Sequence, residues 1–283
     1  MAVDKLVDST QLNADLTSVA NAIRAKGGTS AQMAFPNGFV SAVGAIPTGG
    51  GYTLNDFAES NFGTGKITFN GTHLKPFMFF KSEISEFESD TVTSLYDTNS
   101  ESNSGQGVFQ NCTRITRLSM PNLDNSGSGG YQFAGCTSLI DLHVPNASIG
   151  QHFVDGCTSL ITFVNTKSTT TNNSDFANCT SLQSVDLHII RVRQNCFLRD
   201  TALTILILRH SDAIASLYNI AAFNGTPFAS GGSGGTLYVP QALVANYQAA
   251  TNWSTILGYP NNQILPIEGS IYETQYADGT PIT

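Results

Sequence analysis

Hydrophobic residues recur in one short pattern between Phe109 and Leu208, and the pattern occurs five times. Each copy has a Cys, or an Asp in the last copy, followed by apolar residues three and six positions later. The copies begin at intervals in the low twenties and read FQNCTRITRL, FAGCTSLIDL, VDGCTSLITF, FANCTSLQSV and FLRDTALTIL. A period of this length is typical of a solenoid, in which every repeat forms one coil and neighbouring coils stack on each other.

The last part of each copy predicts a short β-strand, because apolar and polar residues alternate there. In the segment SVDLH, the side chains of Val185 and Leu187 are expected to point inward and that of Asp186 outward. The outward-facing side chains of all copies would form one exposed surface, called the ladder face below, on which Ile205 and Ile207 are also expected. We expect the ladder face to bind the ligand, and its candidate residues are Arg117, Ser119, Asp141, His143, Thr162, Ser184, Asp186, His188 and Arg209.

Cysteine and phenylalanine occupy fixed interior positions in the repeats. Cys112, Cys136, Cys157 and Cys179 share one position, and Cys196 stands just before the Phe that opens the last copy. One Cys per coil predicts a column of buried packing residues at a spacing of roughly 4.8 Å, rather than ligands that converge on a metal. Disulfides between adjacent coils stay open. The Phe that opens most copies is expected to fill the side of the core opposite the ladder face, and its displacement to Phe153 in the third copy predicts a local bulge.

The first 50 residues follow a helical period instead. Leu12, Leu16, Val19 and Ile23 recur at helical spacing, and FPNGFVSAVGAIP fits a turn and a second short helix before the glycine-rich linker at 48–51. Two short amphipathic helices bury little surface alone, so we interpret residues 1–50 as an attachment module. A helical cap folded back on the solenoid is the alternative. The candidate docking residues are Leu12, Leu16, Val19, Ile23, Phe35 and Phe39.

The repeats are expected to be closed by a cap at each end. The sequence KITF, Asn70-Gly71 and THLK predicts a β-hairpin with a type I′ turn in the first cap. In the second cap, TLYVP and NQILPIEG predict strands, and QALVANYQAATNW predicts a helix that buries Leu243, Tyr247 and Trp253. The predicted fold class is mainly β: a leucine-rich-repeat solenoid of about five coils with β caps, preceded by a small α-helical N-terminal module. The predicted segments are the module and linker at 1–50, the N-terminal cap at 51–105, the repeats at 106–212 and the C-terminal cap at 213–283.

Composition narrows the classes of function. Charged residues make up 12% of the chain and the net charge is −8, so no basic surface for nucleic acid is expected. The N-terminus lacks the apolar core of a secretory signal, and no apolar stretch reaches the length of a membrane span. Catalytic and nucleotide-binding motifs are missing, so we expect no enzyme, no cofactor and no metal. Only the pair Asp141 and Asp186 has a spacing that a glycoside hydrolase would tolerate, and nothing around it suggests a cleft.

The string F-x-x-C-T-S-L-x-x-V-x-L resembles the BspA-like, or Treponema-type, leucine-rich repeat of bacterial surface and phage proteins, over residues 76–240. The segment LVDSTQLNADLTSVANAIRAKGGTSAQMAFPNGFVSAV is similar to the opening of minor structural or tail proteins of phages and prophages of Gram-positive gut bacteria. The C-terminal LYVPQALVANYQAATNW and NQILPIEG resemble a closing module of such repeat proteins. The resemblance implies a curved solenoid used for attachment or recognition, without indicating its partner.

Together these features predict a phage virion protein, tail-associated or fibre-like, that is made in the host cytoplasm and displays the repeats for host-surface recognition. Residues 1–50 would bind other virion proteins, and the ladder face would bind a host cell-surface glycan or protein. Virion fibres are commonly trimeric, so we expect a homo-oligomer. An architectural capsid decoration or head fibre and a bacterial surface adhesin are the alternatives, and a depolymerase is a further one from the enzyme class.

Overall fold

The computed structural model describes residues 57–61, 65–75, 78–95, 107–124, 130–229, 234–256 and 263–283, together with Thr17 and Asn21. The chain divides into two compact units, Met1–Glu59 and Ser60–Thr283. Thr17 and Asn21 are helical. The other residues of the expected attachment module, including the candidate docking residues, lie outside the described residues, so that assignment stays a prediction.

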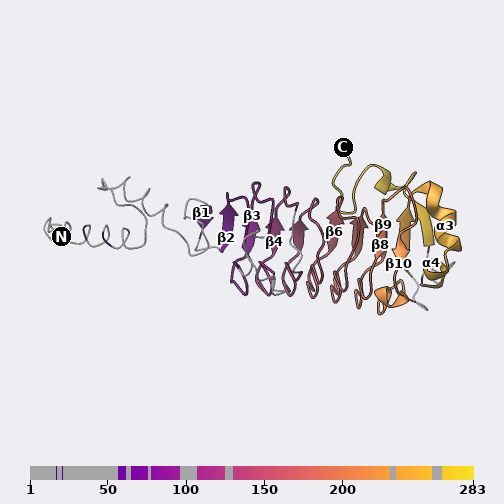
Figure 1. The fold of residues 1–283 in the computed structure, drawn as a ribbon, viewed down its shortest axis with the longest axis horizontal. Coiled ribbons are helices and arrows are strands. Elements are labelled where there is room, and N and C mark those ends of the chain that lie inside the picture. Colours follow the sequence, from indigo (N-terminus) through magenta and orange to yellow (C-terminus); the bar gives the residue numbers. More distant parts are fainter. Residues whose placement is uncertain are drawn as a thin grey trace, which may run out of the picture. The chain divides into compact units, whose positions relative to one another are not determined.

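Short strands stacked side by side build the second unit (Figure 1). The strands are β1 (Phe57–Asn61), β2 (Lys66–Phe69), β3 (Glu86–Glu88), β4 (Arg117–Ser119), β5 (Asp141–His143), β6 (Thr162–Asn165), β7 (Ser184–Leu187), β8 (Arg191–Val192), β9 (Ile205–Leu208), β10 (Ser216–Leu217), β11 (Thr236–Val239) and β12 (Gln263–Pro266). The helices are short, and they are η2 (Ile220–Phe223), η3 (Gln241–Leu243), α3 (Val244–Ala249), α4 (Thr251–Ile256) and η4 (Ile271–Glu273).

Two five-stranded sheets contain most of the strands, one in the order β1-β2-β3-β4-β5 and the other in the order β12-β11-β9-β7-β6. A separate two-stranded sheet joins β8 and β10 in parallel. From β2 to β5 and from β6 to β12, neighbouring strands of the two larger sheets are parallel. Their register places the interior positions of the repeats opposite one another: Leu118 pairs with Leu142, and Val185 lies between Phe163 and Leu206. This pairing confirms a mainly β solenoid of leucine-rich-repeat type.

The cysteines form a hydrogen-bonded column through the core. All five are buried and free. The Cys136 thiol donates to the carbonyl oxygen of Phe109 at 3.0 Å, and the Cys157 thiol to that of Phe133 at 3.1 Å, in each case in the preceding coil. Cys112 and Cys179 repeat the arrangement. Burial raises the pKa of the Cys157 thiol, so the thiol stays protonated and keeps its donor. The predicted packing role of the column is confirmed.

Phenylalanine rings pack against one another along the core. The Phe109 and Phe133 rings are stacked with centroids 5.7 Å apart, and those of Phe176 and Phe197 with centroids 5.3 Å apart. The displaced Phe153 is fully buried and meets Phe133 edge-on at 5.0 Å. Aromatic contacts of this kind add to the free energy gained by burial, so the rings bind successive coils together.

The residue before each Cys explains part of the repeat motif. This position is in the left-handed conformation in every copy, with φ of 60° at Asn111, 72° at Gly135 and 62° at Asn178. Asn and Gly tolerate this conformation better than other residues. At Gly135 a β-carbon would also lie only 2.2 Å from the Asn111 Oδ1, so a larger residue there would require the Asn111 side chain to move.

Two expectations about the ends of the repeats are corrected. Residues 66–69 and 72–75 do not form a hairpin: β2 pairs in parallel with β3, and neither Asn70 nor Gly71 has the positive φ that a type I′ turn needs. The chain instead enters another coil of the solenoid directly. For the same reason the solenoid has about seven turns rather than the expected five.

The C-terminal segment contains the expected strands, whereas the single helix expected over QALVANYQAATNW is divided into η3, α3 and α4. β11 and β12 continue the second sheet, and Leu243, Tyr247 and Trp253 are buried. The Trp253 indole N–H donates to the Ala215 carbonyl oxygen at 2.7 Å, which fastens the helices to the last coils. Residues 271–283, called the strap below, then run back from β12 toward β6 (Figure 1). Among the helices that the structure describes, none is long and apolar enough to cross a membrane.

Candidate ligand-binding site

The ladder face is divided by a break between β5 and β6. These two strands belong to different sheets, and the described residues 140–143 and 161–164 share no ladder pairing across the break. The adjoining coil is the one in which Phe153 is displaced, and the Phe153 ring meets the ring of Phe163 on β6 at 6.0 Å. The irregularity predicted for the third copy therefore coincides with a gap in the sheet.

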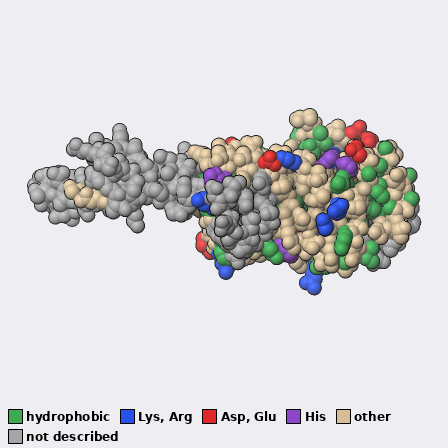
Figure 2. Space-filling view, viewed as in Figure 1, with side chains coloured by type: hydrophobic (Ala, Val, Ile, Leu, Met, Phe, Trp, Pro, Cys, Tyr) green, Lys and Arg blue, Asp and Glu red, His purple; other side chains and the backbone are tan. Residues whose placement is uncertain are grey.

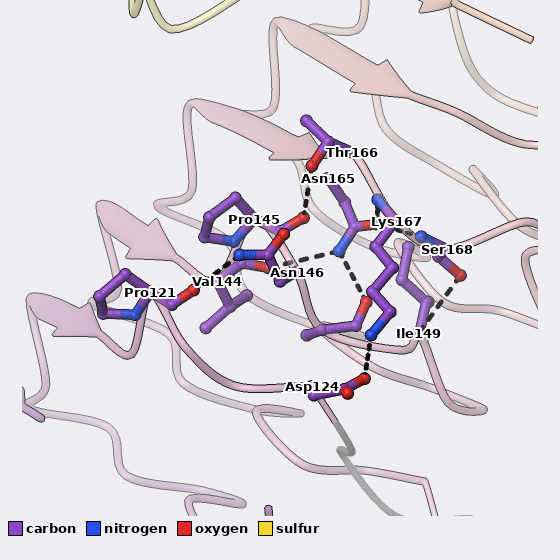
Figure 3. Close-up of polar contacts among 11 residues, drawn as sticks. Pro121, Asp124, Val144, Pro145, Asn146, Ile149, Asn165, Thr166, Lys167 and Ser168 are labelled. Carbon is purple, nitrogen blue, oxygen red and sulfur yellow. Dashed lines mark hydrogen bonds and ion pairs between the residues drawn. The ribbon is translucent and has the colours of Figure 1, made fainter. Parts of the chain in front are cut away.

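Asn165 bridges the two sheets beneath this break. Its side-chain amide donates to the carbonyl oxygens of Val144 at 3.3 Å and Ala147 at 2.7 Å, and its Oδ1 accepts the Ser168 amide N–H at 2.7 Å. The Asn146 side chain in turn donates to the Pro121 carbonyl oxygen at 2.9 Å. Figure 3 shows Asn165 at the centre of these contacts, between the loops that follow β5 and β6. These side-chain contacts, together with the Thr166 N–H that donates to the Pro145 carbonyl oxygen at 2.8 Å, join the two coils beneath the break.

The strap covers the ladder face on one side of the break. The guanidinium of Arg209 forms a two-pronged ion pair with Asp186, in which both nitrogen–oxygen distances are 2.7 Å. It also donates to the carbonyl oxygens of Tyr272 at 2.9 Å and Gln275 at 3.1 Å, and the Ala277 N–H donates to Asp186 at 3.1 Å. Burial raises the pKa of the Asp186 carboxyl, and its hydrogen bonds with Arg209 oppose that shift.

This arrangement corrects the expectation that Asp186 and Arg209 are exposed ladder residues. The side chain of Asp186 is 1% exposed and that of Arg209 is 14% exposed. Ile207 is also buried, because it packs with Ile267 and Tyr272. The strap is a nonlocal element with no repeat pattern, so strand alternation alone could not show that it covers these positions.

The ladder face is open on the other side of the break. Arg117 and Asp141 form an ion pair at 3.3 Å in which both side chains are more than half exposed. The hydroxyl of Thr68 donates to Glu88 at 2.8 Å and, with the ammonium of Lys66, holds the pKa of the Glu88 carboxyl below its usual value. Figure 2 shows charged side chains as small separate spots on the visible face, among backbone and other side chains. This part of the molecule therefore presents a polar surface without a strong field of either sign.

A groove of about 530 Å³ lies at the break, where the open ladder face meets the end of the strap. Residues of 140–146 and 161–166 form its solenoid side, and residues of 276–283 form its strap side. The volume lies in the usual range for sites that bind small ligands. A smaller hollow of about 250 Å³ lies between β2, β3 and β4, where Glu88, Arg117 and Ser119 are among its lining residues.

The structure brings together only part of the predicted site. Asp141, His143 and Thr162 line the groove. Ser184 is buried and shares a hydrogen bond with Thr162 at 3.0 Å, whereas His188 is half-buried and packs edge-on against His210 at 5.3 Å. The prediction missed the groove residues of the strap, including Tyr276, Asp278 and Thr280. The Asp-Gly pair in the sequence YADGT indicates a turn. Nothing in the sequence, however, places that turn against β5.

The described residues assemble neither a metal-binding group nor the carboxyl pair considered above. Within the described ranges, no three His, Cys, Asp or Glu side chains form a group that could hold a metal ion. Asp141 and Asp186 do not occupy equivalent positions in their strands. Asp141 is the first residue of β5, as Thr162 and Ser184 are of β6 and β7, where they pair with each other. Asp186 is the third residue of β7 and lies opposite Val164. Asp186 is also buried in its ion pair, so the two carboxyls do not face a common substrate position.

Parallel coils, a column of inward-facing apolar residues and an outward ladder define a leucine-rich-repeat solenoid. The family description "BspA type Leucine rich repeat region" matches residues 55–160 and 102–226, which together cover more than half of the chain. The chain belongs to this BspA-type leucine-rich-repeat family. The match begins before the range expected from the sequence motif, in agreement with the additional coil formed by β2.

Solved leucine-rich-repeat structures are similar to the chain at low identity. A leucine-rich-repeat protein of T. pallidum is 14% identical, and the match covers 72% of this chain and 93% of that one, with a TM-score of 0.43. A leucine-rich cell surface protein of Faecalibacterium prausnitzii is 11% identical, with coverage of 74% and 70% and a TM-score of 0.29. A leucine-rich-repeat protein of Bacteroides ovatus is 13% identical, with coverage of 77% and 66% and a TM-score of 0.32. No curated protein matches the chain.

Proposed function

We propose that the protein is a non-enzymatic recognition protein that binds a host-surface molecule through the open part of its ladder face. The observation that carries this proposal is the groove at the break, because Asp141, His143 and Thr162, which were expected to face a ligand, line one concave site there. Membership of a repeat family whose fold presents a long ladder surface supports the same role.

We propose further that the protein is displayed on a phage virion, as a tail-associated or fibre-like component. The resemblance of the N-terminal segment to phage and prophage structural proteins supports this location. Residues 1–50 would then bind other virion proteins, and a homo-oligomer would present several grooves to one cell. Several weak sites on one particle bind a surface more tightly than a single site, provided that their spacing fits the receptor.

The recognition role is tested by adsorption of the full-length protein to host cells. Asp141 and His143 are both exposed, so the double change Asp141→Ala with His143→Ala should leave the fold intact and weaken adsorption. Glu83→Ala with His73→Ala is the matched control, since both residues are exposed and neither lines the groove. Equal adsorption by the two double variants would show that the receptor binds elsewhere or not at all.

The virion location is tested separately. Electron microscopy of particles with a labelled antibody should find the protein on the tail, and deletion of residues 1–50 should prevent its incorporation. A label on the capsid, together with normal adsorption of particles that lack the protein, would indicate the architectural alternative. A label on the bacterial envelope in the absence of particles would indicate a bacterial adhesin.

A further inference from the structure

We infer that the groove between β5, β6 and the strap binds an uncharged oligosaccharide. This inference rests on the proposed recognition function and names the class of ligand that the groove would select. Four properties of the groove support it: its width, its hydrogen-bonding groups, its charge and its apolar walls.

The width of the break excludes an added peptide strand. Cα atoms of β5 and β6 lie within 8 Å of one another. A strand inserted between them would require neighbours roughly 9.5 Å apart, twice the usual strand spacing. The ligand must therefore enter the groove from the solvent side as a compact group, and ring-shaped sugar units satisfy that requirement.

The hydrogen-bonding groups of the groove are rich in acceptors. Asp141 uses one carboxylate oxygen for Arg117, and Asp278 uses one for the Thr280 N–H at 2.9 Å. A carboxylate accepts up to about four hydrogen bonds, so both keep free capacity. The Asn146 side chain donates outward to Pro121, which leaves its Oδ1 as a further acceptor. A ligand that carries many hydroxyl donors suits this set.

The charge of the groove opposes acidic ligands. Asp141 and Asp278 belong to its lining, whereas no Lys or Arg does. A sialylated or sulfated sugar would place its anion near these carboxylates, and the neighbouring cation, Arg117, is already paired with Asp141. A basic peptide side chain would have to compete with Arg117 for Asp141. An uncharged polyol avoids both costs.

The apolar walls match the C–H faces of sugar rings. Ile140 is 50% exposed and Ile161 is 42% exposed, and both line the groove. The strap adds the ring of Tyr276, whose position is fixed by the Arg209 guanidinium 5.0 Å from the ring centroid. Large apolar residues exposed next to convergent polar groups are typical of a binding site.

The test uses the full-length protein, labelled and applied to an array that carries neutral, sialylated and sulfated oligosaccharides and basic peptides. We expect binding to neutral oligosaccharides and none to the acidic ones. Titration calorimetry with the best neutral oligosaccharide would then give the affinity of the variants.

Two pairs of variants locate the site. Ile161→Trp should fill the groove and abolish binding, whereas Ile190→Trp places the same ring at a residue of similar exposure, 40%, outside the groove. Asp141→Lys should also abolish binding, and Asp212→Lys is its control, because Asp212 is exposed and does not line the groove. Circular dichroism and thermal unfolding would establish that all four variants fold.

The outcomes separate this inference from the recognition function. Binding to basic peptides or acidic sugars alone, or neutral-sugar binding that survives both groove variants, would overturn the inference. If the protein adsorbs to host cells and Ile161→Trp does not reduce adsorption, the groove assignment fails while the recognition function stands. If the protein does not adsorb to any host cell, the recognition function fails as well.

Discussion

The open and the covered parts of the ladder face are built from the same repeat, yet an arginine–aspartate ion pair has very different surroundings in the two parts. On the open side, Arg117 and Asp141 form an ion pair in water. On the covered side, Arg209 and Asp186 form an ion pair that is almost fully buried beneath the strap. The strap contacts only the second pair, since Tyr272 and Gln275 accept hydrogen bonds from Arg209 and Ala277 donates one to Asp186.

The same asymmetry extends into the core. Among the described residues, every buried charged side chain lies after β6, and they are Asp175, Asp186 and Asp200. Asp200 replaces the Cys of the earlier copies and leaves one carboxylate oxygen without a partner. The coils before β6 are thus stabilised by apolar packing, thiols and surface polar contacts, whereas the coils after it also bury ionisable groups.

The largest effect should come from breaking the covered ion pair. Arg209→Ala would leave the buried Asp186 without its cation, and losses of this kind cost about 3–5 kcal/mol of unfolding free energy. Chemical denaturation should measure this loss, and hydrogen exchange should show faster exchange in the strap than in β3 and β4. The double change Arg209→Met with Asp186→Leu should recover most of the stability, because it leaves no buried charge. If single and double variants were equally unstable, lost packing would be the cause.

A smaller effect should follow from the buried carboxyls of the coils after β6. Burial raises the pKa of Asp175 and of Asp200 well above the ordinary value, so the folded state holds their protons more tightly than the unfolded state. Their contribution to the unfolding free energy is therefore fully present below about 3.9, the pKa of an aspartate in the unfolded chain. It is lost as pH rises through the higher pKa of the folded state. Asp175→Asn with Asp200→Asn should therefore be increasingly more stable than the native chain from pH 4 upward, by about 1–3 kcal/mol at neutral pH.

The control for this pH effect is Asp141→Asn, which removes one exposed carboxylate from the open side. Because Asp141 is exposed, losing its ion pair should change the unfolding free energy by at most about 1 kcal/mol. Hydrogen exchange at β7 and β9 should carry the pH dependence of the native chain. A constant difference between the native chain and the Asp175/Asp200 variant at every pH would refute the assignment of raised pKa values.

The smallest effect should come from the open ion pair. Arg117→Ala removes a pair whose side chains are 61% and 57% exposed, and exposed pairs contribute at most about 1 kcal/mol. Denaturation at low and high salt should show a small loss that salt removes, because free ions screen exposed charges. If Arg117→Ala lowered the unfolding free energy as much as Arg209→Ala, the open and the covered ion pairs would contribute equally to stability, contrary to what their exposure predicts.

Sequence reasoning predicted well whatever the repeat determines locally. The positions of Leu118, Leu142 and Val185 in the strands, the burial of Cys136 and Phe109, and the burial of Tyr247 and Trp253 near the end all follow from periodicity. Each of these features depends on residues close in sequence or on the neighbouring copy of the repeat, so the amino-acid sequence is enough to predict it.

The predictions that were wrong concern segments that are distant in sequence, or a segment whose sequence resembles another motif. Asn70-Gly71 favours a hairpin turn by itself, but parallel pairing of β2 with β3 buries Phe69 and Phe87 together, and this packing overrides the local preference. The strap joins residues more than sixty positions apart, such as Arg209 and Tyr272, with no periodic signal. The groove depends on both the break and the strap, so only its solenoid wall could be predicted.

The hydrogen bonds of the thiol column all point toward the N-terminal end of the solenoid, which bears on how such a protein can gain or lose repeats. Each of the four thiols of the column gives its hydrogen to a carbonyl of the coil before it, so inserting or deleting one whole coil renews the same donor–acceptor match. Asp200 stands in the next position of the column and instead accepts the Cys179 N–H at 2.8 Å. A gene could therefore lengthen or shorten this protein in units of one repeat, shifting the groove along the molecule without redesigning the core.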